Sequence, residues 1–287
     1  MIVCLFSSSV AKQYKTADLI IFSYHRPMQL HAVLSSVQKY ISNLNQIYVL
    51  YRTDNQEYET AYQEVQELFS QVKFVKQGPD PRADFKPLLL QCFFGSTAEY
   101  LIFGVDDDIV KDFVDIDECI AAMEESGAQG LYLRLGKNIV RQYGQDLQLK
   151  VPPHVPVRED IYKFQFKDGI GDWCYPNNVD MTLYKKSDIA TFLRNASYSS
   201  PNTLESTWSG LADVNKFGLF FSSSKQFTLP MNIVQQDWVI AHENLFTAAE
   251  LLVKWQEGLT MDIEQFYKVP NDCAFMGYEP AFIARAQ

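Results

Sequence analysis

The chain has 287 residues, of which 47% are hydrophobic and 14% aromatic, and its formal net charge is -10. A chain of this length and apolar content can bury a substantial core, which excludes an intrinsically disordered protein. Its acidity argues against DNA or RNA as a partner, because binding to a phosphate backbone needs clustered Lys and Arg. A small nucleotide stays compatible, since a divalent cation can turn an acidic pocket into a phosphate site.

Strand and helix patterns alternate through the first half of the chain. Pro27 suits the first turn of a helix, and Pro79 and Pro81 predict a loop. The alternation predicts an α/β, Rossmann-like fold, with a mostly parallel sheet and helices on both faces. The expected strands are 18–24, 46–51, 73–76, 99–105 and 130–135, and the expected helices are 27–41, 58–69, 84–94 and 115–125.

The rhythm changes after about residue 137. Residues 151–156 predict an irregular connector, residues 162–183 are rich in Gly, Asp, Asn and aromatic side chains, and residues 247–256 predict a helix. No internal repeat separates the two parts. We therefore expect one domain over residues 1–287, with a functional division near residue 137.

The cysteines and the ends of the chain bear on its location. Five cysteines with long spacings and no Cys-x-x-Cys pair predict reduced, mostly buried thiols rather than a zinc site, as in a cytosolic protein. Residues 1–6 are too few for a signal peptide, and no stretch approaches the roughly 20 apolar residues that span a bilayer. We expect a cytoplasmic protein without a transmembrane segment; peripheral contact with the inner membrane face stays open.

Asp106, Asp107 and Asp108 directly follow the predicted strand 99–105. Ligands of parallel sheets bind beyond the carboxyl ends of the strands, and adjacent carboxylates repel one another unless a cation relieves them. On an extended chain Asp106 and Asp108 would project to one side. The pattern predicts a site for Mn2+ or Mg2+ with Asp108 and Asp106 as ligands. The alternative is a solvated turn, because Asp is common where strands end.

The order of these elements, with the segments 24–27 and 103–109, resembles the GT-A glycosyltransferases, of the family-2-like and exostosin-like kinds that carry a triple-Asp version of the DxD motif. Phe85-Lys86 and the Asn-x-Leu-Glu element at 202–205 are similar to small bacterial proteins of surface-polysaccharide loci. The resemblance implies a GT-A fold whose DxD motif binds metal and a nucleotide-sugar diphosphate. It also implies a nucleotide-sugar-binding half at 1–137 and an acceptor-binding half at 138–287.

Several residues of the first half are candidates for contact with the donor. Tyr24 would stack on the base and Arg26 would reach phosphate, although a surface turn explains both. Asp54 matches a position where GT-A enzymes often place a uracil-contacting carboxylate, and helix capping explains it equally well. One carboxylate of the Asp106–Asp107–Asp108 run would contact the ribose or sugar rather than the metal.

Further candidates flank these segments. Arg82 or Lys86 would offset diphosphate charge, or each is a generic exposed cation. Asp172 and Trp173 lie beside two glycines, and an aromatic ring with polar neighbours suits a sugar, although a Gly turn with a core Trp has the same pattern.

The transfer chemistry needs a carboxylate that deprotonates the acceptor hydroxyl. Glu205 is the first candidate for this base and Asp172 the second; the alternative for Glu205 is a helix N-terminal acid. His242 would be a third metal ligand, or an ordinary surface residue. With Glu205 as base, the transfer would invert the anomeric centre.

The resemblance thus implies a metal-dependent hexosyl- or N-acetylhexosaminyltransferase of glycan or surface-polysaccharide synthesis. Its partners would be a nucleoside-diphosphate sugar and a glycan or lipid-linked acceptor, not nucleic acid. A nucleotidyltransferase is disfavoured, because the loop after the first strand has no glycine to bind phosphate. A non-catalytic sugar- or nucleotide-binding module with the same fold stays open as an alternative.

Overall fold

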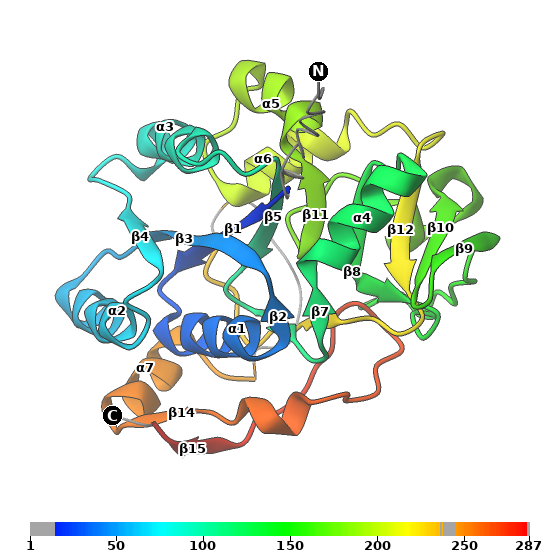
Figure 1. The fold of residues 1–287 in the computed structure, drawn as a ribbon. Helices are drawn as coiled ribbons and strands as arrows, with labels where there is room; N and C mark the ends of the chain where they lie inside the picture. Colours follow the sequence, from blue (N-terminus) through cyan, green and yellow to red (C-terminus); the bar gives the residue numbers. More distant parts are fainter. Residues whose placement is uncertain (1–14, 236, 238–244, 286–287) are drawn as a thin grey trace, which may run out of the picture.

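The computed structural model describes residues 15–235, 237 and 245–285, and its centre is one twisted sheet (Figure 1). Strands β10 and β11 run opposite to the other strands, so the sheet is mostly parallel in direction, as the sequence predicts. The nine strands lie in the order β4 (Lys73–Lys76), β3 (Leu44–Arg52), β1 (Ala17–Tyr24), β5 (Tyr100–Val105), β11 (Thr182–Lys185), β8 (Gly130–Gly136), β12 (Phe217–Phe221), β10 (Ile161–Gln165) and β9 (His154–Arg158).

Helices cover both faces of this sheet, which confirms the predicted α/β class (Figure 1). One face packs against α1 (Pro27–Tyr40), α2 (Gln56–Leu68), α4 (Ile116–Ser126) and α7 (Ala248–Gln256). The other face packs against α3 (Pro81–Phe94), α5 (Lys186–Asn195) and α6 (Pro201–Ser209).

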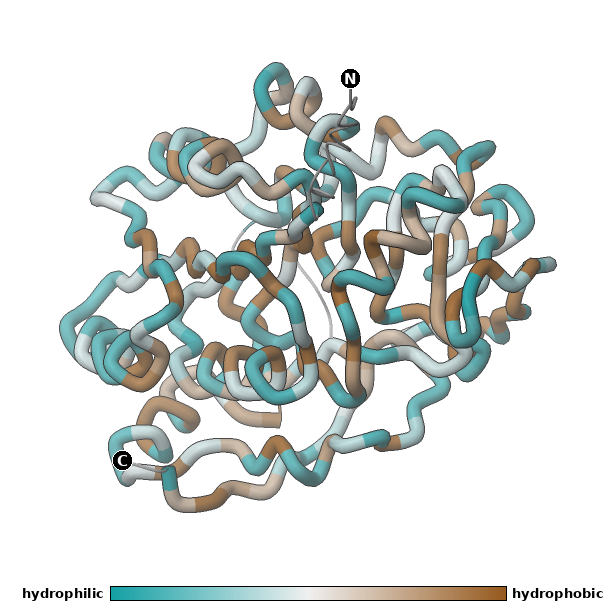
Figure 2. Tube along the Cα trace, viewed as in Figure 1, coloured by the Kyte–Doolittle hydropathy of each residue, from teal (hydrophilic) through white to brown (hydrophobic). Residues whose placement is uncertain are grey.

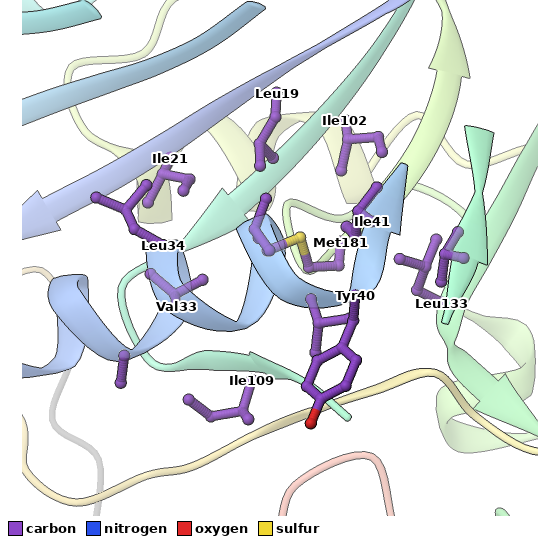
Figure 3. Packing of buried hydrophobic residues seen from close by; sticks show 14 of the residues in the cluster. Leu19, Ile21, Val33, Leu34, Tyr40, Ile41, Ile102, Ile109, Leu133 and Met181 are labelled. Atoms are coloured by element: carbon purple, nitrogen blue, oxygen red, sulfur yellow. The ribbon is translucent and has the colours of Figure 1, made fainter. Parts of the chain in front are cut away.

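Strand β1 shows why the sheet needs two helical layers. Successive side chains of a strand point to opposite faces. Leu19 and Ile21 therefore lie on the α1 face, near Val33 and Leu34 of that helix (Figure 3). Ile20 and Phe22 pack on the other face, with side chains of α3, α5 and α6. A strand that is apolar at every position is buried on both sides, as the unbroken Leu-Ile-Ile-Phe run predicts.

The second half of the chain contains strands that the sequence analysis did not predict. Strand β11 enters the sheet between β5 and β8, antiparallel to both, and β12, β10 and β9 extend it. The predicted irregular connector at 151–156 is corrected, because β9 begins at His154. The predicted loop at Pro81 is also corrected: Asp80 caps α3 through the Ala83 N–H, and Pro81 begins the helix.

Short elements complete the fold at the edges of the main sheet. Three two-stranded sheets pair β6 (Asp108–Val110) with β13 (Gln226–Thr228), β2 (Ile41–Ser42) with β7 (Val114–Asp115), and β14 (Leu259–Met261) with β15 (Phe282–Ala284). Single 3-10 turns are η1 (Phe166–Asp168), η2 (Gly171–Cys174) and η3 (Ile263–Phe266). The β6–β13 pair matters for the site, because it fixes the backbone that follows β5.

Hydrophobic segments gather in the interior and hydrophilic ones on the outer turns (Figure 2). Cys92, Cys119 and Cys273 are buried free thiols and Cys174 is a partly exposed one, in agreement with the prediction for these four residues. Among the described residues, none of the helices has the length and apolar character that a membrane crossing requires.

Candidate active site

The site lies beside β1, where the chain stops adding strands on one side of this strand and continues on its other side. The chain passes from β1 to β3 and β4 on one side, then returns to β5 on the other side of β1. Ligands of such sheets bind beyond the carboxyl ends of the strands at this point, which here are the ends of β1 and β5. Tyr24 ends β1, and Asp106 directly follows β5.

Asp106 is turned back toward the end of β1. Its Oδ2 accepts hydrogen bonds from the Ser23 hydroxyl at 2.8 Å and from the Tyr24 N–H at 3.1 Å. Asp106 and Asp107 form a turn rather than an extended segment, so the predicted alternation of the three side chains is corrected. Burial raises the pKa of Asp106, although Arg26 opposes this rise.

Arg26 lies between two of the three aspartates. Its Nη1 donates to Asp106 Oδ1 at 2.8 Å and to Asp107 Oδ2 at 2.9 Å, while its Nε donates to Asn232 Oδ1 at 2.8 Å. Burial alone would lower the pKa of Arg26, but the two carboxylates outweigh it and raise the pKa above its usual value. Arg26 is therefore a fixed internal countercharge.

Asp108 belongs to the protein interior. It is fully buried, its Oδ1 accepts from the Gln226 amide at 2.6 Å and the Thr228 hydroxyl at 2.9 Å, and its Oδ2 accepts from the Val105 N–H at 3.0 Å. Burial, followed by the nearby Asp180 and Asp107 carboxylates, raises its pKa well above the usual value. In this arrangement the Asp108 carboxylate fixes the turn, and its role as a metal ligand stays a prediction.

Asp180, from the second half of the chain, lies close to the aspartates that follow β5. Asp180 lies just before β11, and because β11 is antiparallel to β5, its first residue lies at the edge where β5 ends. Asp180 is partly buried, and its carboxylate accepts no hydrogen bond from any residue that the structure describes. Burial raises its pKa to about 6, and the Asp107 and Asp172 carboxylates add to that rise.

The backbone at Asp180 is constrained by its neighbour. Met181 has a φ of 43°, in the left-handed region that costs a non-glycine residue about 1–3 kcal/mol. Its side chain is buried in the core beside Ile102 and Leu133, which holds the turn in place (Figure 3). The strained turn thus fixes the backbone next to Asp180 at the edge where β5 ends.

Glu205 lies in α6, and its carboxylate is close to that of Asp180. Its Oε1 accepts from the Val179 N–H at 3.2 Å. Burial raises the pKa of Glu205 to about 8, and the Asp180 carboxylate adds to that rise. The structure thus brings this predicted residue next to the acidic group, in the middle of a helix rather than in its first turn.

Asp172 and Trp173 face inward. Asp172 is 7% exposed, and its Oδ1 accepts from Nη1 of the buried Arg134 at 3.1 Å. Trp173 is fully buried in a cluster of aromatic side chains, and its Nε1 donates to the Ile139 carbonyl at 3.0 Å. The alternative of a glycine turn with a core Trp therefore describes this segment better than a sugar contact.

Tyr24 and Asp54 meet at the ends of β1 and β3. The Tyr24 hydroxyl donates to Asp54 Oδ2, and Arg52 holds the same carboxylate with two hydrogen bonds of 2.9 and 3.0 Å. The Tyr24 ring stacks on His25 at 4.2 Å, and His25 stacks on Tyr58 at 4.0 Å. This group combines stacked aromatic rings with a partly exposed carboxylate.

Two other candidates bind groups elsewhere in the protein. Lys86 donates to the Arg194 and Ala196 carbonyls and so caps the end of α5. Arg82 is an exposed cation that pairs with Asp237 at 3.0 Å. His242 lies outside the described residues.

The carboxylates differ in their fitness for a divalent cation. Within the described part of the chain, no three His, Cys, Asp or Glu side chains are arranged as a metal site. Asp106 and Asp108 use both carboxylate oxygens in hydrogen bonds within the protein. Asp107 uses only Oδ2, and Asp180 uses neither oxygen toward described residues. Mg2+ and Mn2+ need only one or two protein carboxylates beside diphosphate and water, so Asp107 and Asp180 fit such an ion.

Comparison with known proteins supports the resemblance. The chain is similar to a curated glycosyltransferase. It is 28% identical over 193 residues to the bifunctional glycosyltransferase pgtA of Dictyostelium discoideum. The aligned region covers 61% of this chain and 24% of that protein. The chain thus spans about a quarter of the relative's length. No family model matches the sequence.

Two solved structures are also similar in shape. The structure of S. aureus TarS has a TM-score of 0.48 at 13% identity, covering 75% of this chain and 37% of that one. The structure of GalNAc-T7 with UDP, GalNAc and Mn2+ has a TM-score of 0.47 at 10% identity, covering 76% of this chain and 44% of that one.

Proposed function

We propose that this chain transfers a sugar from a nucleoside-diphosphate sugar to a hydroxyl group of a glycan or lipid-linked acceptor. The observation that carries the proposal is the proximity of Asp107, Asp180 and Glu205 to one another beyond the ends of β1 and β5, near Tyr24 and Asp54, in a chain similar to a glycosyltransferase. The GT-A resemblance of the sequence agrees with this arrangement.

The donor's base would lie at the Tyr24 group. A nucleobase stacks on aromatic rings, and the Asp54 carboxylate would accept a ring N–H, which uracil, thymine and guanine carry and cytosine and adenine lack. Arg52 holds the carboxylate in place and keeps it ionised, because this pairing lowers the pKa of Asp54. The site therefore favours a UDP-, dTDP- or GDP-sugar.

The diphosphate would lie between this group and the carboxylates. Asp107 and Asp180 would hold Mn2+ or Mg2+, and the ion supplies positive charge that stabilises the leaving diphosphate. Arg26 orients Asp106 and Asp107 and places a positive charge beside both. Residues 1–137 would thus provide most of the donor site, and residues 138–287 would complete it through Asp180.

Glu205 would accept the proton of the acceptor hydroxyl in its ionised form, which a pKa raised to about 8 makes more abundant as the pH rises toward that value. Its carboxylate lies beside Asp180 and is fixed by the Val179 N–H. Attack by the hydroxyl oxygen forms the new glycosidic bond as the bond to the diphosphate oxygen breaks. One displacement inverts the anomeric carbon, so this role for Glu205 corresponds to an inverting enzyme.

Thermal unfolding with a panel of UDP-, GDP-, CDP- and dTDP-sugars tests the donor site. A ligand that binds only the folded state raises stability in proportion to ln(1 + [L]/Kd). We expect a shift for one nucleotide with Mn2+, which is lost with chelator and in Asp107→Asn. Asp117→Asn, which changes an exposed acid on α4, is the matched control and should keep the shift. No shift with any donor at millimolar concentration would overturn the proposal.

A further inference from the structure

We propose that a surface hollow beyond β8 binds a neutral sugar residue of the acceptor, next to the residue that receives the new sugar. The inference rests on the proposed function only in treating the bound sugar as part of the acceptor. The observations on the hollow do not depend on that function. Its volume is about 410 Å3, and the side chains that form its walls and rim are Arg141, Tyr143, Asn271, Asp272, Phe275 and Met276.

Two aromatic rings form one wall of the hollow. Tyr143 and Phe275 have ring centroids 5.7 Å apart at an interplanar angle of 28°, and both side chains are partly exposed. The C–H faces of a pyranose ring are apolar and stack on such rings. Trp173, the aromatic residue that the sequence suggests for this purpose, is buried, so this pair is the better candidate for a sugar contact.

A charge-neutral pair forms the rim. Arg141 donates from Nε and Nη2 to the Asp272 carboxylate at 2.9 and 2.8 Å. The two side chains are 43% and 54% exposed, so the pair offers both N–H donors and carboxylate acceptors to hydroxyl groups. Since the charges cancel, the rim suits an uncharged polyol better than phosphate or a sugar acid.

The hollow lies at the same edge of the sheet as the proposed site. Strand β8 runs in the same direction as β5, so the chain that follows β8 starts at the edge where the aspartates lie. The Phe275 backbone pairs with Thr228, whose hydroxyl donates to the buried Asp108 Oδ1. Gln142, between Arg141 and Tyr143, accepts the N–H of the buried Asp172 at 3.0 Å. A further residue of the acceptor would therefore lie at this edge, beside the residue that receives the sugar.

Saturation-transfer NMR with free oligosaccharides, in the absence of nucleotide, tests this subsite. The probes are neutral di- to tetrasaccharides of hexose and N-acetylhexosamine. We expect saturable binding of at least one probe, weakened tenfold or more by Tyr143→Ala and by Phe275→Ala. Phe275→Tyr, which keeps the ring, should retain binding. Phe113→Ala is the matched control, because that ring is 58% exposed but lies outside the hollow.

Release of nucleoside diphosphate from the donor by the wild-type chain is measured in parallel. Saccharide binding that depends on the two rings, without any donor turnover, would support the subsite and overturn the proposed function. Donor turnover without saturable binding of any probe would overturn the subsite alone. Binding that is unchanged in both alanine variants would also overturn it, since the rings would then not be the contact.

Discussion

Arg26 Nη1 lies 2.8 Å from Asp106 Oδ1, and the two residues are 8% and 3% exposed. A pair so deeply buried is costly to break, because a lone charge would remain without water. The same guanidinium also holds Asp107, whose second oxygen accepts no hydrogen bond from the residues that the structure describes. Arg26 thus supplies a countercharge to two adjacent carboxylates at the end of a strand.

We therefore expect Arg26→Leu to lower the free energy of unfolding by about 3–5 kcal/mol, since Asp106 would lose its buried partner. Urea denaturation measures this change. Arg82→Ala removes an exposed cation and should cost less than about 1 kcal/mol. Similar losses for both variants would contradict the role of Arg26.

Asp180→Asn should separate function from stability. Its carboxylate accepts no hydrogen bond from described residues, so thermal stability should be kept or raised, while turnover falls on the order of 100-fold. Asp172→Asn should behave in the opposite sense, because it leaves the buried Arg134 without its carboxylate, at a cost of about 3 kcal/mol. Equal turnover in wild type and Asp180→Asn would remove Asp180 from the site.

The first half of the fold follows from local patterns in the sequence. Apolar runs and helical spacing place β1, β3, β4, β5 and β8 within a residue or two of their limits. The insertion of β11 between β5 and β8 could not be predicted this way, because strand order depends on packing between distant segments. Asp180 was missed for that reason: only the antiparallel path of β11 brings it to the aspartates.

The position of the three aspartates after a strand identifies them as candidate site residues. The different role of each aspartate could not be predicted from that position. Asp108 is buried because β6 pairs with β13, which brings Gln226 and Thr228 to its carboxylate. Nothing in the local sequence indicates that pairing. Trp173 likewise has the surroundings of a sugar contact in sequence, and only the tertiary structure places it in a core cluster.

Asp54→Ala should raise the KM for the donor about tenfold with little change in kcat, because base contacts are made equally in the ground and transition states. Steady-state kinetics with the donor varied measures both constants. Glu57→Ala, an exposed acid three residues away, serves as the control and should leave KM unchanged. A large fall in kcat for Asp54→Ala would place this residue closer to the chemistry.

The partly buried His31 should lower the free energy of unfolding as the solution becomes acidic. Burial lowers its pKa to about 4, below the usual value of 6.5, so the unfolded chain binds a proton first as pH falls. Stability from this group is full above pH 6.5 and declines toward pH 4, by about 3 kcal/mol at most. His31→Gln should flatten unfolding free energy over this window. An unchanged slope in urea denaturation at pH 4 to 7 would contradict the assignment.

Direct detection of the reaction tests the central claim. Wild-type chain, Glu205→Gln and Asp107→Asn are incubated with UDP-, dTDP- and GDP-sugars and Mn2+, and free nucleoside diphosphate is quantified by chromatography. We expect release from one donor by the wild type, stimulated by an acceptor saccharide and reduced 100-fold or more in both variants. No release from any donor, or release that both variants retain in full, would contradict a glycosyltransferase site at these carboxylates.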